Sequence, residues 1–525
     1  MNITGDMLIG ASAVRGTEAK LQAIDPATGD VIGPDFHGGG AAEVERACAL
    51  AEAAFDEYRA ISPERRATFL EAIASGIEAL GDTLIQRAQR ESGLPVARLQ
   101  GERGRTANQL RLFASVLRDG RWQSATLDSA LPERTPPRPD LRMQKIPVGP
   151  VAVFGASNFP LAFSVAGGDT AAALAAGCPV IVKAHSAHLG TSELVGRVIQ
   201  RAVADAGLPE GVFSLLVGAG VNIGTALVTH PVIQAVGFTG SRAGGLALVQ
   251  AANNRPQPIP VYAEMSSINP MFLLPDAMSN RGPQIARDFV ESLVLGVGQF
   301  CTNPGLAIAM EGPSLDAFRE AAIAALTEKA AATMLTPGIH AAYEKGVAQL
   351  GDIEGLKQIG AGKAPAGPNQ ARPVLFETTA QRFAEDHRAQ AEVFGPSSVL
   401  VVCQDQAEMV ALATRLEGQL TATIQADAPD YESAGRLLTV LERKAGRVLF
   451  NGYPTGVEVS HAMVHGGPFP ATSDTRATSV GATAIERFLR PVCYQNVPAA
   501  LLPEALKDGN PLGLWRLQDG KLSHR

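Results

Sequence analysis

From residue 147 onward, short β-rich runs alternate with alanine-rich helical stretches, and this alternation limits the folds open to the chain more than any other feature. It predicts an open, mostly parallel sheet whose strands are joined by crossover helices, that is, the α/β class. The predicted strands are 151–154, 180–182, 212–217 and 235–238, and the predicted helices are 168–176, 191–205, 222–229 and 243–253.

A second α/β series follows Glu264, and helices precede the first series. A chain of 525 residues is too long for one core and suits two or three packed units. Residues 131–140 contain four prolines and predict a linker or an extended arm. The remaining predicted elements are strands at 305–310, 398–403, 421–425 and 485–495, and helices at 41–59, 63–91, 101–119, 284–296, 315–332, 405–415 and 429–443.

The charge and the cysteines exclude several classes of protein. The formal net charge is −7 and the arginines are scattered, which argues against a nucleic-acid or anionic-membrane partner. No apolar run is long enough to predict a membrane span, and the segment MNITGDMLIG does not have the pattern of a signal peptide. Five widely spaced cysteines without a CxxC pair predict neither a disulfide framework nor a zinc site, and favour the reducing cytoplasm.

Two glycine-rich turns follow predicted strands and would allow close approach to a ligand. Gly218, Gly220 and Gly224 lie between the third strand of the first series and the next helix, where glycines permit contact with a dinucleotide. Gly240 and Ser241 begin the helix after the fourth strand, where free backbone N–H groups suit a phosphate. Alone, the first pattern is equally compatible with an ordinary turn, and the second favours an ordinary serine-capped helix.

Five polar side chains stand near strand ends, where α/β sheets place ligands. Asn158, in FGASNFP, could donate to an oxyanion, although an Asx turn is the ordinary alternative. Cys301, in GQFCTNPG, could be exposed and reactive, although most free cysteines are buried small hydrophobes. Glu264 and Glu392 adjoin apolar runs, where a carboxylate is costly unless it is exposed, paired or functional. Lys183 ends the strand VIVK.

Together these features resemble the aldehyde dehydrogenase superfamily from about residue 20 to residue 495. The resemblance is carried by the order of Asn158, Lys183, Gly240, Gly245, Glu264, Cys301 and the EVFGP motif at 392–396. Longer stretches, such as NGYPTGVEVSHAMVHGGPFP, resemble bacterial 2,5-dioxopentanoate (α-ketoglutaric semialdehyde) dehydrogenases and the related NADP-dependent fatty aldehyde dehydrogenase. Two segments depart from the general pattern: EMSS at 264–267 and HGGPFPATS at 465–473.

The resemblance implies a covalent mechanism. Cys301 would attack the aldehyde carbon as a thiolate, and the Asn158 amide with the Cys301 backbone N–H would hold the oxyanion. Hydride transfer to a nicotinamide would leave a thioester, which Glu264 would hydrolyse by activating water. For that role the pKa of Glu264 is expected to be raised by its apolar surroundings.

The resemblance also implies the cofactor contacts. Lys183 and Glu392 resemble the ribose-binding pair, and Ser241 resembles the pyrophosphate contact. NAD-preferring members commonly carry glutamate where Ser186 stands here, so NADP is predicted to be accepted and preferred, with NAD as the alternative. The full predicted cofactor set is Ser157, Lys183, Ser186, Gly220, Gly224, Phe238, Gly240, Ser241, Gly245, Glu392 and Phe394.

The predicted reaction is NADP-dependent oxidation of 2,5-dioxopentanoate to 2-oxoglutarate, with a fatty or other aldehyde as the alternative substrate. The distal carboxylate needs a cation, ideally an arginine that binds it through two hydrogen bonds. Arg105 and Arg111 are the candidates, because their helix borders the substrate tunnel in the family; helix-surface solvation is the alternative for both. The predicted apolar lining of the tunnel is Phe159, Phe163, Phe300, Val457, Val459 and Phe469.

The implied fold has a Rossmann-type cofactor-binding domain, an α/β catalytic domain and an oligomerisation arm. An exposed two-stranded arm is unstable alone, so a homodimer or homotetramer is expected. The expected bounds are 1–124 with 148–263 for the cofactor-binding domain, 264–473 for the catalytic domain, 125–147 with 474–500 for the arm, and 501–525 for a tail without predicted structure.

Other patterns carry less weight. His461 and His465 have the spacing of a metal pair but lack the glutamate of HExxH and a third ligand, so a turn or packing role is predicted and no metal site is expected. Lys183 with Ser266 and Ser267 loosely resembles the Ser/Ser/Lys set of amidases. That alternative leaves Cys301, Glu392 and Asn158 unexplained. Two further alternatives are an acylating dehydrogenase, which often lacks the general base, and a binding protein that has lost catalysis and would lack the nucleophile or the base. The presence of both Cys301 and Glu264 argues against each.

Overall fold

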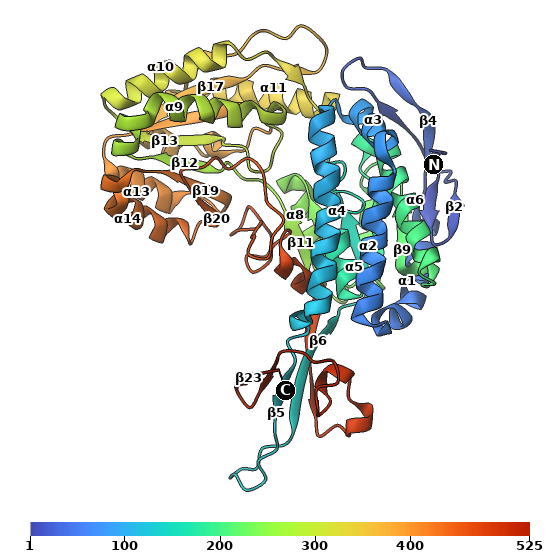
Figure 1. Ribbon diagram of the computed structural model, residues 1–525. Helices are drawn as coiled ribbons and strands as arrows, with labels where there is room; N and C mark the ends of the chain where they lie inside the picture. Colours follow the sequence, from blue (N-terminus) through green and yellow to red (C-terminus); the bar gives the residue numbers. More distant parts are fainter. Residues whose placement is uncertain (1, 525) are drawn as a thin grey trace.

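The computed structural model describes residues 2–524 and confirms the α/β class, with two seven-stranded sheets lying side by side (Figure 1). In the first sheet five strands run parallel, and β1 and β2 extend it in antiparallel pairing. The order of this sheet is β11 (Val261–Glu264), β10 (Ala235–Thr239), β7 (Val151–Phe154), β8 (Val180–Lys183), β9 (Phe213–Leu216), β1 (Met7–Ile9), β2 (Ser12–Val14).

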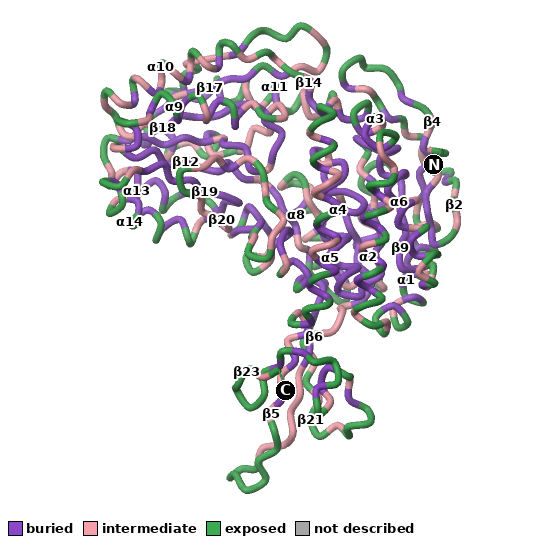
Figure 2. Tube along the Cα trace, in the orientation of Figure 1, coloured by how far each residue is buried: buried purple, intermediate pink, exposed green. Residues whose placement is uncertain are grey.

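The helices around the first sheet largely follow the prediction. The predicted helix 63–91 is divided at Gly81, whose φ of +53° a continuous helix does not allow. Helix α5 is buried along its whole length, as Figure 2 shows, and this accounts for its alanine-rich sequence. The helices are α1 (Ala41–Ala60), α2 (Pro63–Ala79), α3 (Gly81–Ser92), α4 (Val96–Asp119), α5 (Gly168–Ala176), α6 (Leu189–Asp205), α7 (Asn222–Thr229) and α8 (Arg242–Asn253).

The second sheet is parallel except at its β15 edge. Its order is β15 (Lys357–Ala361), β17 (Val374–Thr379), β18 (Ser397–Cys403), β13 (Leu306–Met310), β12 (Pro270–Leu273), β19 (Gln419–Gln425), β20 (Ala445–Phe450). Its helices are α9 (Pro275–Val294), α10 (Pro313–Thr327), α11 (Pro337–Gly351), α12 (Ala380–Glu385), α13 (Gln406–Arg415) and α14 (Tyr431–Leu441).

Alternate residues of the second sheet serve two different cores. On β12, Phe272 packs into the core that includes residues of α13 and α14, whereas Met271 and Leu273 pack into the core under α9 and α10. Because successive strand residues point to opposite faces, a strand covered on both sides must be apolar throughout. This explains why these strands appear in the sequence as continuous apolar runs.

An arm projects from the body of the molecule, and it contains the C-terminal tail (Figure 1). Strand β6 (Leu141–Pro147) pairs with β21 (Leu489–Gln495) on one side and with β5 (Thr126–Asp128) on the other. The tail, for which no structure was predicted, adds β22 (Arg516–Gln518) and β23 (Lys521–Ser523) beyond β5. The arm is thus a five-stranded sheet rather than a two-stranded one.

The described residues also form two small antiparallel sheets of two strands each. They are β3 (Ala19–Ile24) with β4 (Val31–Gly38), and β14 (Ala332–Thr333) with β16 (Gln370–Ala371). Within residues 2–524, none of the helices has the length and apolar character needed to cross a membrane.

Candidate active site

The site lies at the carboxyl ends of the parallel strands of the first sheet, next to the second sheet. Asn158 follows β7, Ser186 follows β8, Ser241 follows β10, and Glu264 is the last residue of β11. Because β7, β8, β10 and β11 are parallel neighbours, their carboxyl ends bring these residues to one edge of the sheet. Cys301 reaches the same edge from the turn between α9 and β13.

The turn that carries Cys301 has an unusual backbone. Gly296, Val297 and Gly298 have φ values of +57°, +61° and +63° in succession. A side chain at Gly298 would place its Cβ only 2.4 Å from the backbone of Gly395, so glycine is needed there. The left-handed backbone of the β-branched Val297 costs on the order of 1–3 kcal/mol. Such local strain is common at functional turns.

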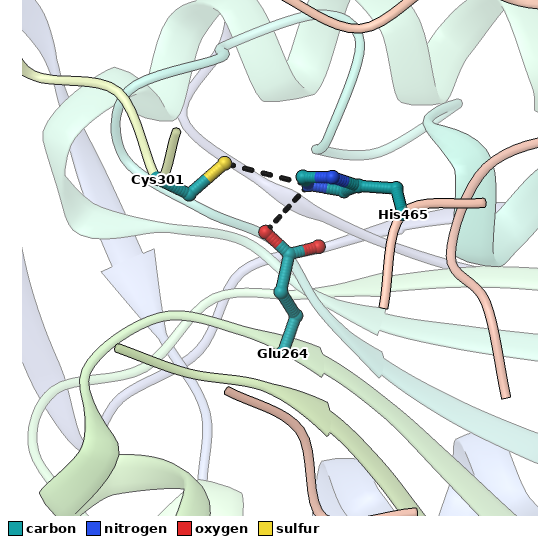
Figure 3. Close-up of side chains that lie close together, drawn as sticks. All are labelled: Glu264, Cys301 and His465. Carbon is teal, nitrogen blue, oxygen red and sulfur yellow. Dashed lines mark hydrogen bonds and ion pairs between the residues drawn. The ribbon is translucent and has the colours of Figure 1, made fainter. Parts of the chain in front are cut away.

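Cys301, His465 and Glu264 form a contiguous cluster (Figure 3). His465 Nε2 lies 2.9 Å from Glu264 Oε1 and 3.4 Å from the Cys301 sulfur. The Ser479 hydroxyl donates to Glu264 Oε2 at 2.9 Å. His465 and Glu264 are buried, and Cys301 is partly exposed. The prediction of a mere packing or turn role for His465 is therefore wrong: it contacts both the thiol and the carboxylate.

The segment 465–473, which departs from the family pattern, places His465 in this cluster. The Met265 N–H donates to the Ala471 carbonyl at 2.8 Å, and Glu264 forms a β-bridge with Thr472. The His465 N–H donates to Thr478 Oγ1 at 2.8 Å. The segment thus runs along the end of β11 and holds the imidazole beside the glutamate.

The surroundings shift the pKa values of the thiol and the carboxyl in opposite directions. Burial, together with the nearby Glu264 charge, raises the pKa of Cys301 well above its usual range. Burial alone would raise the pKa of Glu264, but the His465, Ser479 and Cys301 contacts outweigh it and lower that pKa below its ordinary value. The expected rise for Glu264 is therefore contradicted. The glutamate is ionised at neutral pH, whereas the thiol needs a base to lose its proton.

Asn158 lies between the nucleophile and the aromatic end of the site. One N–H of its side-chain amide donates to the Gln299 carbonyl at 3.0 Å, and the amide has a second N–H. Its backbone carbonyl accepts a 2.7 Å hydrogen bond from Arg98, whose guanidinium lies 4.5 Å from the centre of the Phe300 ring. Arg98, which the sequence did not single out, thereby links the Asn158 turn to the Cys301 turn.

A cavity of about 970 Å³ runs through this edge of the sheet, large enough for a dinucleotide-sized ligand. It is bounded by the catalytic candidates and by the start of α8, where the Ser241 hydroxyl caps the helix. Of the predicted site residues, the following line it: Asn158, Ser157, Ser186, Gly240, Ser241, Glu264, Cys301, Glu392 and Phe394.

The other five predicted cofactor residues lie outside the lining of this cavity. A side chain at Gly245 would meet Met265 at 2.8 Å, and one at Gly224 would meet Phe154 at 3.3 Å, so both glycines allow close packing. Phe238 packs against the hydrophobic core around the first sheet. Gly220 lies in a turn with φ of +65°, and burial lowers the pKa of Lys183. Their contact with a cofactor stays a prediction.

Most of the predicted substrate residues form an aromatic cluster next to His465, outside the lining of this cavity. The Arg105 guanidinium lies 4.8 Å from the centre of the Phe163 ring and 5.7 Å from that of Phe159. The Phe159 ring meets the Phe163 and Phe300 rings edge to face, with centroid separations of 5.2 Å and 5.4 Å respectively. Val457 and Val459 pack against the same aromatic group.

Two of the sequence candidates lie elsewhere. Arg111 is half-exposed and makes two hydrogen bonds to Glu78, at 2.6 and 2.7 Å. It therefore has the alternative role, that of a solvated residue on the helix surface. Phe469 is 52% exposed and lies under the Arg242 guanidinium, apart from the aromatic cluster. Arg105 differs from both, because its Nε is buried and has no hydrogen-bond partner among the described residues.

Comparison with known proteins gives full-length matches. The model of the aldehyde dehydrogenase family matches residues 13–486. The chain is 64% identical to α-ketoglutaric semialdehyde dehydrogenase 2 of Azospirillum brasilense, covering 99% of this chain and 100% of the relative. It is 51% identical to the α-ketoglutaric semialdehyde dehydrogenase of Acinetobacter baylyi, covering 99% of each.

Solved structures share the fold. An aldehyde dehydrogenase C mutant of Pseudomonas syringae, crystallised with NAD+ and octanal, superposes with a TM-score of 0.79 at 24% identity. The match covers 94% of this chain and 96% of that one.

Proposed function

Because the chain belongs to the aldehyde dehydrogenase family, we propose that it oxidises α-ketoglutaric semialdehyde (2,5-dioxopentanoate) to 2-oxoglutarate, with NADP as the preferred hydride acceptor. The observation that carries the proposal is the Cys301 thiol, placed beside His465 and Glu264 at the wall of the large cavity. The names of the two curated relatives support the choice of substrate.

The first chemical step is loss of the thiol proton. Because burial holds the pKa of Cys301 high, a base must lie within reach, and His465 Nε2 does at 3.4 Å. In the tautomer whose Nε2 carries no hydrogen, His465 accepts the thiol proton at Nε2. The N–H so formed donates to Glu264 Oε1, whose negative charge stabilises the imidazolium. The thiolate attacks the aldehyde carbon and forms a thiohemiacetal.

The oxyanion of that intermediate needs donors on the cavity wall. We propose the second N–H of the Asn158 amide and the Cys301 backbone N–H for this role, and one such donor lowers the barrier by about 3–4 kcal/mol. Arg98 supports the geometry through the Asn158 carbonyl.

The thioester is then cleaved by water. The nicotinamide cofactor, when bound, supplies the acceptor for the hydride of the aldehyde carbon. Glu264, ionised because its pKa is lowered, accepts a proton from the attacking water. The departing Cys301 thiolate takes back the proton held by His465. Water thus supplies the added oxygen of the carboxylic acid.

The side chains beside the cavity also fit the cofactor. Ser241 and the N-terminus of α8 suit a pyrophosphate. Glu392 lines the cavity, and burial raises the pKa of its carboxyl to about 8. This carboxyl is therefore largely protonated near neutral pH and can donate to a ribose hydroxyl. The same proposal includes the division into a cofactor-binding domain, a catalytic domain and an oligomerisation arm. It also includes a homodimeric or homotetrameric state and a cytoplasmic location.

Arg105 is proposed to bind the distal carboxylate of the substrate. Its buried Nε, without a partner among the described residues, gives the guanidinium a donor for an anion in an aromatic setting. Arg105→Met keeps a long apolar side chain and removes the charge. We expect kcat/KM for 2,5-dioxopentanoate to fall by about 10–100-fold, the value of a charge-assisted hydrogen bond.

The measurement is the rate of reduced-nicotinamide formation with 2,5-dioxopentanoate and with a long-chain aldehyde of neutral tail. Arg111→Met is the matched control, because it removes the same charge from the outer surface of the same helix. If Arg105→Met lowers kcat/KM equally for both aldehydes, the carboxylate role is refuted. If the wild-type enzyme favours the fatty aldehyde, the proposed substrate is wrong.

Ser186 is proposed to accommodate the 2′-phosphate of NADP. It lines the cavity directly after β8 and is small and neutral. Ser186→Glu places a carboxylate against that phosphate, so kcat/KM for NADP should fall by at least about 10-fold, with little loss for NAD. Steady-state kinetics with both cofactors give this ratio, and Ser186→Ala separates charge repulsion from loss of the hydroxyl. An unchanged ratio in Ser186→Glu would show that the 2′ position lies elsewhere.

The amidase alternative has little support from the contacts. The Ser267 hydroxyl hydrogen-bonds within a buried polar group: it lies 2.9 Å from Asn269 Oδ1 and 3.0 Å from Gln419 Oε1, and it accepts from the Leu420 N–H. A serine held in this way is part of the packing between the two sheets.

A further inference from the structure

We propose that Cys301, Glu264 and His465 also form a binding site for Zn²⁺, and that occupation of this site reversibly switches off the proposed aldehyde oxidation. The three ligand atoms come from distant positions in the chain, so the cysteine and histidine spacing of the sequence predicted no zinc site. They meet only in the folded protein (Figure 3).

The spacing of the three atoms is close to that of a tetrahedral zinc site. A Zn²⁺ ion bound by thiolate, imidazole and carboxylate keeps these ligand atoms about 3.4–3.6 Å apart. Here the Cys301 sulfur and His465 Nε2 are 3.4 Å apart, and Nε2 and Glu264 Oε1 are 2.9 Å apart. All three atoms lie within 4.8 Å of one another, so changes of side-chain torsion suffice to admit the ion.

The ligand types and charges favour zinc. Thiolate, imidazole and carboxylate are the three side-chain ligands of Zn²⁺, and three protein ligands leave a fourth position open. A thiolate beside the buried Glu264 carboxylate brings two negative charges together, and a divalent cation balances them. Groups behind the ligands already hold them: Ser479 donates to Glu264 Oε2, and Asn269 Nδ2 donates to the Cys301 carbonyl at 2.9 Å.

Zinc binding and catalysis exclude each other because they use the same atoms. Binding replaces the thiol proton by a sulfur–zinc bond and releases that proton to solvent, with no change of oxidation state. The sulfur lone pair is then committed to the metal, and the imidazole can no longer accept a proton. Inhibition should therefore compete with the aldehyde and be reversed by a chelator.

The decisive measurement is metal binding itself, made on the full chain without aldehyde or cofactor, so that it does not depend on the proposed reaction. Zn²⁺ is titrated against a chromophoric chelator, and Co²⁺ is added separately to detect a sulfur-to-cobalt charge-transfer band. We expect one tight Zn²⁺ equivalent per chain, weakened by more than about 100-fold in Cys301→Ala and in His465→Asn. Cys493→Ser and His461→Asn, which change an exposed cysteine and an exposed histidine, should bind as the wild type does.

The outcomes separate clearly. Tight binding that survives both Cys301→Ala and His465→Asn, or a cobalt spectrum without the charge-transfer band, overturns the site. The same follows if no tight equivalent is found in the wild type. Circular dichroism of each variant distinguishes loss of a ligand from loss of the fold. If zinc binds as expected but 2,5-dioxopentanoate is not oxidised, the proposed function fails and the metal site stands.

Discussion

Replacing Cys301 by alanine is expected to lower kcat for aldehyde oxidation by at least about 10⁴-fold, because removal of a covalent nucleophile leaves only binding and the oxyanion site. No other thiol can take over: within the described residues Cys48, Cys178 and Cys403 are buried, and Cys493 lies on the arm strand β21. The measurement is the steady-state rate of reduced-nicotinamide formation from 2,5-dioxopentanoate.

Cys493→Ser is the control for this variant, because it removes an exposed free thiol far from the cavity and should leave kcat unchanged. Cofactor binding by Cys301→Ala, followed by quenching of protein fluorescence, should match the wild type, which shows that the cavity is intact. A Cys301→Ala protein that kept more than a few per cent of the activity would require a different nucleophile.

Glu264→Gln should separate the two halves of the reaction. The side chain keeps its size, but it can no longer accept a proton from water, so hydrolysis of the thioester should slow by about 10²–10⁴-fold. Formation of the thioester should be less affected, because His465 still lies beside the thiol. We therefore expect a burst of reduced nicotinamide close to one equivalent per chain, followed by a slow steady state.

Stopped-flow absorbance measures the burst, and mass spectrometry of the quenched protein should find the acyl group on Cys301. Glu432→Gln, an exposed change on α14, is the matched control and should show wild-type turnover without accumulation of the acyl-enzyme. If Glu264→Gln abolishes the burst as well, the carboxylate is essential for forming the thioester through its contact with His465, and slow hydrolysis is not the main defect.

The sequence predicted best the elements whose local pattern agrees with their packing. Helix α5 and strand β7 have the predicted bounds because each is buried along its whole length. Strands β1 to β4 were missed: they are short or exposed, and pairing with distant partners, not local propensity, makes them strands. The same reason explains β22, whose pairing partner β5 lies far back along the chain.

The residues of the candidate site also fall into two groups, those that local sequence patterns predicted and one that they missed. Cys301, Glu264 and Asn158 each follow a strand or helix with a recognisable turn, and the structure brings all three to one cavity. His465 was undervalued because the visible signal was its spacing from His461, whereas its partner is 201 residues away. The departure of 465–473 from the family pattern was the signal that could have found it.

The arm has a consequence for how the protein is made. Strands β5 and β6 pair with β21 and β22, which lie more than 340 residues further along the chain, so this sheet cannot assemble until residues 489–518 have been synthesised. The cluster around the nucleophile shares this property, since Ser479 and His465 must both reach Glu264. A nascent chain therefore carries its reactive cysteine without the base that activates it for the 164 residues that separate Cys301 from His465.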